Sequence, residues 1–323
     1  MIGPRVSVII PCFNARQTIA ETVQSALRQT FRDFEILVID DGSTDESADV
    51  IRGFGDAVQA EFGPNRGASA ARNRGTALAR GAFIQYLDSD DLLVPDALER
   101  RVAALEASGA DVAYGDWQRF EIGPDGTRHD GDIIARVIED VDSDPEIACA
   151  TQFWAPPAAL LYRRTIVEAI GGWNERLPVI QDARFLFDAA YRGARFVRVL
   201  GVSAYYRVAP GSLSRRDDRK FMLDLYRNGC EIQALWQAEG PLSDKRKQAL
   251  ASIFDHAARG LFSSGASEFE DAAMRYIALS SRRMGYPAIA LRLSELMGRD
   301  LAGIVLDRIM RVTGPLRRAI GSN

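Results

Sequence analysis

Three carboxylates within four positions follow a short apolar run in this chain. Residues 83–87 read Phe-Ile-Gln-Tyr-Leu, and Asp88, Asp90 and Asp91 come almost directly after them. Because like charges repel, such a cluster needs water, hydrogen bonds or a cation to compensate. Hard divalent cations take oxygen ligands, and Mg²⁺ typically uses one or two carboxylates together with phosphate oxygens. The cluster therefore indicates a site for a metal and a diphosphate, although an acidic turn before a helix would give the same pattern.

A fourth carboxylate and several arginines fit the same chemistry. Asp41 ends a second apolar run, residues 35–39, and a carboxylate there can accept the imide N–H of uracil or thymine, or N1–H of guanine. Arg66, Arg72 and Arg74 lie in or after a glycine-containing turn, and guanidinium groups suit diphosphate oxygens. Taken singly, an ordinary turn aspartate and a solvated helix face explain these residues equally well.

Asp182 is the candidate proton acceptor. It follows the Gly171-Gly172 break and opens a predicted helix, whose positive end favours the ionised carboxylate. In that form it can remove a proton from an alcohol, whereas a helix N-cap is the structural alternative. The segments Tyr205-Tyr206-Arg207 and Ser212-Leu213-Ser214 either close over a ligand or form a polar linker.

The elements that must position these residues alternate along the first third of the chain. Apolar runs without polar alternation predict buried strands, and helical patterns lie between them. Strands are expected over 6–10, 35–39, 58–62 and 83–87, and helices over 18–29, 68–79 and about 95–108. This alternation predicts an α/β fold with a doubly wound, mostly parallel sheet, whose ligands lie at the carboxyl ends of the strands.

The pattern loosens after residue 114. Residues 130–145 are acidic and poorly periodic, so we expect an irregular, mobile excursion on the surface. Short strands are predicted over 158–162, 196–200 and 204–208, with a helix over 182–191. From residue 218 the chain reads as helical, which predicts a domain spanning 1–217 followed by a small helical domain over 218–323.

Composition excludes several classes of protein. The net charge of −4 gives no global basic field for nucleic acid. The three cysteines lack metal or disulfide spacing and favour a reducing compartment, and no apolar run approaches the ~18 residues of a spanning helix, so a cytoplasmic protein is expected. The chain also lacks the phosphate-binding P-loop and the three-glycine dinucleotide motif.

The ordered motifs resemble those of the inverting family 2 glycosyltransferases of the GT-A fold. Each motif is weak alone, but the set is specific in this order and covers about residues 5–215. The matching segments are Val6–Asn14, Ser25–Phe31, Val38–Asp45, Asn65–Gly67, Ala71–Gly75, Tyr86–Asp91, Gly171–Glu175 and Gln181-Asp182.

The resemblance implies roles for these residues. Pro11, Asn14 and Asp41 would line the nucleoside pocket, with Arg66 and Arg72 beside the donor. Asp88, Asp90 and Asp91 would hold the ribose, the sugar and a Mn²⁺ or Mg²⁺ ion, with Asp90 and Asp91 as metal ligands, and Asp182 would be the catalytic base. The donor would be a nucleotide-sugar, with UDP as the first expectation, and the acceptor a glycan or lipid-linked hydroxyl in cell-surface polysaccharide assembly.

Two departures from the family pattern leave other functions open. Gln181 stands where members usually carry glutamate, and Ala209 lies where many place a histidine that assists at the metal. A catalytically silent sugar-nucleotide or glycan-binding protein is therefore one alternative. A sugar-phosphate nucleotidyltransferase is another, although residues 11–16 do not form the Gly-rich basic loop that it would need.

The end of the chain could contact a membrane. From Leu301 onward an apolar helix face is accompanied by four arginines and one aspartate, a net charge of +3. Such a helix can lie on an anionic bilayer near a lipid-linked acceptor, and packing within the protein or against another subunit is the alternative. The residues concerned are Leu301, Ile304, Val305, Ile309 and Val312, with Asp307, Arg308, Arg311, Arg317 and Arg318.

Overall fold

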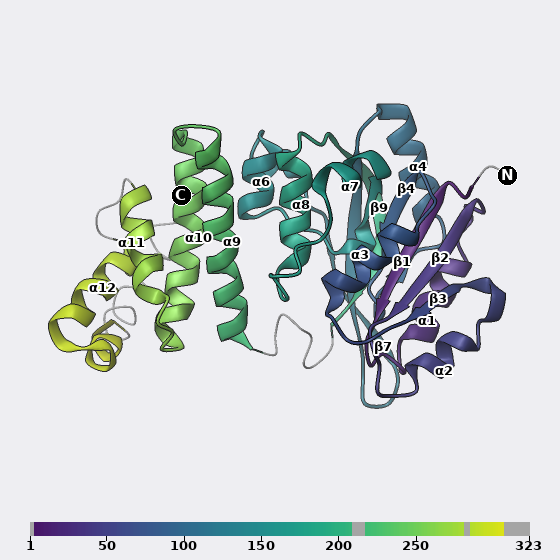
Figure 1. Ribbon diagram of the computed structural model, residues 1–323, viewed down its shortest axis with the longest axis horizontal. Coiled ribbons are helices and arrows are strands. Elements are labelled where there is room, and N and C mark those ends of the chain that lie inside the picture. The colour runs from purple at the N-terminus through teal and green to yellow at the C-terminus, as the bar shows by residue number, and fades with distance from the viewer. Residues whose placement is uncertain (1–2, 209–216, 281–284, 307–323) are drawn as a thin grey trace. The chain divides into compact units, whose positions relative to one another are not determined.

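The computed structural model describes residues 3–208, 217–280 and 285–306. Contacts within the chain form two compact units, Met1–Ser212 and Leu213–Asn323. The first unit contains the mixed sheet, coloured purple to teal in Figure 1, and the second contains helices, coloured green to yellow. The functional roles expected for residues 1–217 and 218–323 remain predictions.

The first half of the sheet is parallel, as predicted. Strand β1 (Val6–Cys12) pairs with β2 (Phe34–Asp40) on one side and β4 (Phe83–Tyr86) on the other, and β2 pairs with β3 (Gln59–Phe62). Every residue of β1 is buried, which explains its uninterrupted apolar sequence. The intervening helices are α1 (Ile19–Leu27), α2 (Ser47–Arg52), the 3₁₀ helix η1 (Gly55–Ala57) and α3 (Ala68–Leu78).

The chain changes its direction of winding at β1. Strands β2 and β3 lie on one side of β1, and β4 lies on the other. The paired part of β4 ends opposite Ile9, so Pro11 lies beyond that ladder and its missing N–H interrupts no bond to β4. Ligands of open α/β sheets bind outside the carboxyl ends of strands at such a switch point, and Asp88 follows β4 at this edge.

The second half of the sheet is mixed. The complete strand order is β3-β2-β1-β4-β8-β6-β9-β5, with β7 paired to β6. Strand β8 is antiparallel to both β4 and β6, whereas β6 and β9 are parallel. These strands are β5 (Leu92–Leu93), β6 (Val112–Ile122), β7 (Arg128–Ile134), β8 (Leu160–Arg163) and β9 (Phe196–Arg207). The predicted class, a Rossmann-like sheet flanked by helices and followed by a helical region, is confirmed.

Two local predictions in this half are wrong. Residues 130–145 are not an irregular excursion, because β7 pairs with β6 and a short helix, α5 (Ile138–Val141), follows it. Side chains on both faces of β7 are exposed, so the sequence has no apolar alternation to reveal a strand. The two strands predicted over 196–200 and 204–208 are one strand, β9, which continues through Gly201 beside an irregularity in its pairing with β6 and ends at Arg207.

Four further helices and one 3₁₀ turn complete the first unit. They are α4 (Ala97–Ser108), α6 (Pro145–Thr151), the turn η2 (Pro157–Ala159), α7 (Arg164–Ile170) and α8 (Gln181–Tyr191). Helix α7 ends at Gly171, whose φ of 86° is the left-handed conformation favoured at a helix C-terminus. The loop between α7 and α8 places Asp182 in the first turn of α8.

The described part of the second unit is helical, as predicted. Its helices are α9 (Asp218–Ala238), α10 (Asp244–Ser263), α11 (Phe269–Leu279) and α12 (Tyr286–Met297). Alanines and aromatic residues of α10 and α11 form a core that also includes Ala290 of α12. The side chains of Asp217 and Ser243 cap the first two of these helices, accepting hydrogen bonds from Lys220 N and Arg246 N.

Candidate active site

The side chain of Asp41, just after β2, binds the 65–67 turn at the carboxyl edge of the sheet. Its Oδ1 accepts a hydrogen bond from Arg66 N at 2.8 Å, and its Oδ2 accepts one from Gly67 N at 2.7 Å. Gly42 follows with a φ of 76°, and a Cβ there would lie only 2.7 Å from Asn65 N. The carboxylate thus shapes the 65–67 turn and keeps one lone pair on each oxygen for another donor.

Asn14 joins the loops that follow β1 and β2. Its Oδ1 accepts a hydrogen bond from Thr44 N at 2.7 Å, and its own N–H donates to Ser43 Oγ at 2.9 Å. Among the described residues it alone combines a side chain with positive φ, 50°. Such a conformation persists where surrounding bonds hold it, often at a functional site. Pro11, by contrast, is buried within β1 opposite Ile39.

The acidic cluster is electrostatically strained in the absence of a ligand. Burial and the negative charge of Asp88 raise the pKa of Asp90 to about 6. Asp91 is only 1% exposed, and burial together with Asp90 and Asp88 raises its pKa well above the usual range. Its Oδ2 is buried, and no described residue donates a hydrogen bond to it. The cluster therefore favours either a proton or a cation.

Arg207, at the end of β9, closes one side of this cluster. Its backbone N–H donates to Asp91 Oδ1 at 2.9 Å, and its Nε donates to the carbonyl oxygen of Asp90 at 2.8 Å. Its Nη2 also pairs with Glu21 of α1 at 2.6 Å. Part of the segment that the sequence left open as a lid or a linker is thus fixed to the acidic turn. Ser212 and Ala209 lie outside the described residues.

Arg72 is the arginine that the fold brings to the cluster. Its side chain is 4% exposed, its Nη2 donates to Asp88 Oδ1, and its guanidinium lies 4.4 Å from the ring centre of Trp173. Nε and Nη1 are buried and have no hydrogen-bond partner among the described residues. Unpartnered buried donors are costly, so these two nitrogens are suited to donate to oxygens of an anionic ligand.

The other two arginines are placed differently. Arg66 is exposed and pairs with Glu175 at 3.4 Å, while its backbone N–H serves Asp41. Arg74 pairs with Glu61 of β3 and does not join the acidic cluster. The sequence could not show which of the three arginines reaches the acidic cluster, because this depends on which face of α3 packs inward, and Arg72 lies on that face.

The loop before Asp182 is fixed by α3. Asn73 accepts a hydrogen bond from Trp173 N at 2.7 Å and donates to Trp173 O at 3.0 Å. A Cβ at Gly172, whose φ is 114°, would approach Asn73 Oδ1 to 2.9 Å. Asn73 also donates to Glu175 Oε1 at 3.0 Å, so the Glu175 carboxylate helps to hold the loop.

Asp182 lies in the first turn of α8 but does not cap it. The N-cap is Ile180, and Asp182 Oδ1 accepts a hydrogen bond from the neighbouring Ala183 N at 2.8 Å. Its Oδ2 accepts one from the indole Nε1 of Trp154 at 2.8 Å. Burial raises the pKa of Asp182, and these two donors and Arg72 oppose the rise. A pKa moved toward neutrality suits a general base.

The contacts of Gln181 show what this residue does at the position where the family usually has glutamate. Its side chain is buried, and its Oε1 accepts a hydrogen bond from Ser69 Oγ of α3 at 2.5 Å. Its Nε2 donates to Pro178 O at 3.3 Å. The amide therefore attaches the start of α8 to α3, a function that needs no negative charge.

Tyr206 lies close enough to both Asp182 and the acidic cluster for their charges to affect its pKa. Burial raises the pKa of this phenol, and the charges of four aspartates raise it further. These are Asp91, Asp182, Asp88 and Asp90. The candidate base and the acidic cluster therefore act on the same side chain, although about ninety residues separate them in sequence.

The residues fit a cation held jointly with a ligand. Within residues 3–208, 217–280 and 285–306, no three His, Cys, Asp or Glu side chains are placed to hold a metal by themselves. The crowded carboxylates with raised pKa values nevertheless match a Mg²⁺-type site, in which phosphate oxygens and water complete the coordination.

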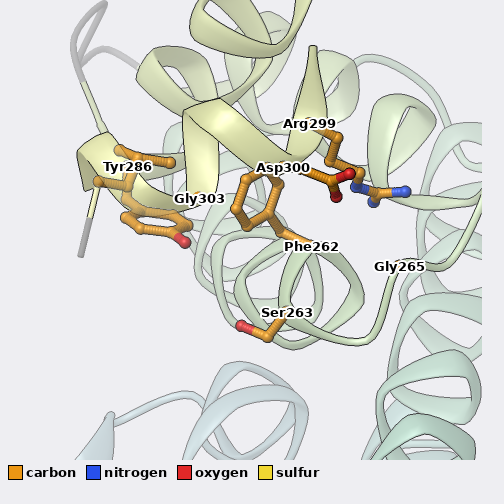
Figure 2. A pocket seen from close by; sticks show the side chains of 8 residues that line it. Phe262, Ser263, Gly265, Tyr286, Arg299, Asp300 and Gly303 are labelled. Atoms are coloured by element: carbon orange, nitrogen blue, oxygen red, sulfur yellow. The ribbon is translucent and has the colours of Figure 1, made fainter.

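The second unit also has a pocket, with a volume of about 390 Å³. Figure 2 shows aromatic and small residues around it, with one ion of each sign, Arg299 and Asp300. Arg299 donates to the carbonyl oxygens of Leu261 and Ala266, so its guanidinium supports the adjoining loop. We assign no chemistry to this pocket. Its lining is Phe262, Ser263, Gly265, Tyr286, Arg299, Asp300, Gly303 and Leu306.

The arrangement matches solved structures of the GT-A fold. Residues 1–349 of Staphylococcus aureus TarS, in a complex with UDP-GlcNAc, match with a TM-score of 0.68 over 92% of this chain and 88% of that one. The mannosyltransferase PcManGT of Pyrobaculum calidifontis, with GDP-Man and Mn²⁺, matches with a TM-score of 0.56 over 91% and 80%. Both are 19% identical in sequence, so the likeness establishes the fold.

Sequence comparison defines the family. Residues 7–171, half of the chain, match the family model of glycosyl transferase family 2. The chain belongs to this family. It is 30% identical over 225 residues to Escherichia coli WfaP, a UDP-Glc:α-D-GlcNAc-diphosphoundecaprenol β-1,3-glucosyltransferase, covering 65% of this chain and 79% of that protein.

Another relative matches over a shorter length. Streptococcus pneumoniae GlyG is 32% identical over 120 residues, which cover 36% of this chain and 40% of GlyG. The chain thus spans less than half of that relative. In the part of the chain that the structure describes, no helix has both the length and the apolarity needed to cross a bilayer.

Proposed function

We propose that this glycosyltransferase moves a sugar from a UDP-sugar to a hydroxyl of a lipid-diphosphate-linked glycan, with inversion at the transferred carbon. The observation that carries the proposal is a chain of contacts between Asp182 and the acidic cluster. Trp154 donates a hydrogen bond to Asp182, and its ring packs against that of Tyr206. The backbone N–H of the next residue, Arg207, donates to Asp91. A base that accepts a proton must lie beside the donor's reactive carbon, and this arrangement allows it. The specificity of WfaP for UDP-Glc and a lipid-linked acceptor supports the choice of substrates.

The residues divide into a donor side and an acceptor side. On the donor side, Asp41 and Asn14 frame the loops for the nucleoside, and the free N–H groups of Arg72 face a diphosphate or sugar oxygen. On the acceptor side, Asp182 takes the proton of the attacking hydroxyl. The new bond joins that oxygen to the anomeric carbon, while the bond from this carbon to the diphosphate breaks and UDP leaves.

A divalent cation, Mn²⁺ or Mg²⁺, would be held by Asp90 and Asp91 with the diphosphate. When bound, it would supply positive charge against the charge that develops on the leaving diphosphate. Asp91 has one oxygen available for this, since Arg207 N occupies the other. Arg72 lies on the Asp88 side of the cluster and adds a fixed positive charge there.

The direct test is transfer between defined substrates. The purified chain is incubated with Mn²⁺, UDP-glucose and α-D-GlcNAc-diphosphoundecaprenol, and products are separated by mass spectrometry. We expect a glycosylated lipid and equimolar UDP, with transfer reduced at least ~10²-fold in Asp182→Asn. Other UDP-sugars are tested if glucose is not transferred.

Nucleotide binding provides the control. Asp182→Asn is nearly isosteric, so it should retain stabilisation by UDP with Mn²⁺. Binding of UDP-sugars without transfer or UDP release in the parent protein would favour the silent binding protein instead. Near-parental transfer by the Asn variant would refute Asp182 as the base.

We further propose that the C-terminal helices give the enzyme peripheral contact with the cytoplasmic face of a membrane. Leu296, Leu301 and Ile304, near the end of the described residues, are 80%, 57% and 64% exposed, and exposed apolar side chains that cluster suit a membrane contact. The rest of the predicted membrane-binding helix lies outside the described residues. It contains Arg308, Arg311, Arg317 and Arg318, with Ile309 and Val312. A lipid-linked acceptor would make such contact useful.

A further inference from the structure

One aromatic side chain outside all the sequence motifs contacts the proposed base. Trp154 lies in the loop between α6 and η2, and its indole Nε1 donates to Asp182 Oδ2 at 2.8 Å. Among the described residues, the other carboxylate oxygen accepts only a local backbone N–H, from Ala183 at 2.8 Å. The indole is therefore the contact that ties the orientation of this carboxylate to a separate part of the fold.

Trp154 is itself held in place by two perpendicular aromatic rings. Its ring centre lies 5.8 Å from that of Trp117 on β6 and 5.9 Å from that of Tyr206 on β9, with interplanar angles of 90° and 85°. Edge-to-face contacts of this kind stabilise a defined ring orientation. Trp117 is 3% exposed, so the indole of Trp154 rests against the core of the sheet.

Charged groups near Asp182 change its pKa in opposite directions. Arg72 of α3 favours the ionised form and Asp88 opposes it. Asp182 in turn raises the pKa of Tyr162 on β8 and, with the acidic cluster, that of Tyr206 on β9. Trp154 differs from these groups because it is uncharged and makes a directed hydrogen bond, so its effect depends on orientation and persists at high salt.

We propose that Trp154 is a positioning residue for transfer: its indole N–H fixes the Asp182 carboxylate so that the remaining lone pairs face the acceptor hydroxyl. This inference rests on the proposed role of Asp182 as the base. A base turned away from the hydroxyl is ineffective even when ionised, because proton transfer requires hydrogen-bond contact. The indole also stabilises the ionised carboxylate, which broadens the pH range in which the base works.

Two matched variants separate the hydrogen bond from the packing. Trp154→Phe keeps an aromatic ring and removes the donor. Trp117→Phe makes the same substitution in the same aromatic cluster, but the indole N–H of Trp117 is buried without a partner and its loss breaks no bond. Both variants, Asp182→Asn and the parent are compared with UDP-glucose and α-D-GlcNAc-diphosphoundecaprenol, or with the UDP-sugar that the parent transfers.

We expect Trp154→Phe to lower kcat about tenfold, the effect of one hydrogen bond to a charged group. KM for the UDP-sugar should not change, and the acid limb of the pH profile should move to higher pH. Trp117→Phe should retain the parental profile. Equal effects of the two substitutions, or an unshifted acid limb in Trp154→Phe, would overturn the inference.

A second measurement needs no turnover. The chain contains four tryptophans, so ¹⁵N-labelled protein gives at most four indole N–H signals, which single Trp→Phe variants assign. The Trp154 signal should titrate with pH at the acid limb of activity and should move in Asp182→Asn, whereas the Trp117 signal should do neither. A Trp154 signal insensitive to both changes would refute the hydrogen bond.

The outcomes also distinguish this inference from the function on which it depends. Retained transfer in Asp182→Asn would remove the base assignment itself. Loss of transfer in Asp182→Asn, with Trp154→Phe no worse than Trp117→Phe, would leave the base in place and eliminate only the positioning role.

Discussion

Replacing Asp90 with asparagine should stabilise the metal-free protein while weakening its donor site. The pKa of Asp90 is raised, so the folded protein binds this proton more tightly than the unfolded chain does. The linked stability is fully present below the unfolded pKa, 3.8, and is lost as the pH rises through the folded pKa, about 6. At pH 7.5 the ionised Asp90 therefore costs stability, and a neutral asparagine removes that cost.

The magnitude follows from the same values. The pKa rises by about 2 from 3.8 to about 6, and 1.36 kcal/mol for each unit of pKa gives an upper bound of about 3 kcal/mol. Asp90 is only partly buried, and solvent screens part of the repulsion by Asp88, so we expect about 1–2 kcal/mol. For a unit of this size that corresponds to a rise of about 2–8 °C in Tm.

Thermal unfolding in the presence of chelator measures this effect. The relevant transition is the one that UDP with Mn²⁺ shifts in the parent protein, since it reports on the nucleotide-binding unit. Asp90→Asn should raise that Tm at pH 7.5, and the difference should shrink as the pH approaches 4.5. Asp33→Asn, at an exposed carboxylate just before β2, is the control and should leave Tm unchanged at both pH values.

The reasoning fails if Asp90→Asn lowers Tm at pH 7.5, or if the gain is the same at both pH values. The first result would mean that the Asp90 carboxylate makes favourable bonds worth more than the repulsion. The second would mean that the gain comes from packing rather than from charge. Addition of Mn²⁺ and UDP should reverse the order of stability, because the parent gains ligand binding that the variant lacks.

Three further predictions concern binding and location. Chelator should abolish most of the stabilisation by UDP and stop transfer; unchanged binding and turnover, followed by thermal shift and UDP release, would contradict the metal assignment. Arg72→Met should weaken UDP-sugar binding by about tenfold or more in calorimetry, whereas Arg74→Met, at an arginine paired with Glu61, should have little effect. The full chain should float with anionic liposomes more than a chain ending at Asp300, and equal flotation would remove the membrane contact.

The sequence predicted the elements of the first half of the sheet because burial on both faces gives strands a continuous apolar pattern. Strand β1 is the clearest case, since all seven residues are buried. Because the carboxyl ends of parallel strands meet at one edge of a sheet, the sequence also predicted that Asp41 and the cluster after β4 lie at the same edge. In the second half, β7 is exposed on both faces, and β9 continues through Gly201, so neither shows the pattern that local reasoning requires.

Tertiary contacts account for what the sequence could not predict at the site. Trp154 precedes Ala155-Pro156 in a loop without a motif, and only the folding of α6, β6 and β9 around it brings its indole to Asp182. Arg72 and Arg74 look equivalent in sequence, yet the turn of α3 buries one beside Asp88 and leaves the other exposed. In both cases the missing information is the direction of a side chain.

Three locally unfavourable features of the first unit lie at one edge of its sheet. Asn14 has positive φ, and, among the described residues, the buried Nε and Nη1 of Arg72 and the buried Oδ2 of Asp91 have no hydrogen-bond partner. Each such feature costs stability unless a ligand or a surrounding bond compensates it. Natural sequences depart from local rules chiefly where function demands it. A ligand that carries anionic oxygens and a cation would satisfy Arg72 and Asp91 at the same time, so their proximity is itself an argument for a metal-bound diphosphate.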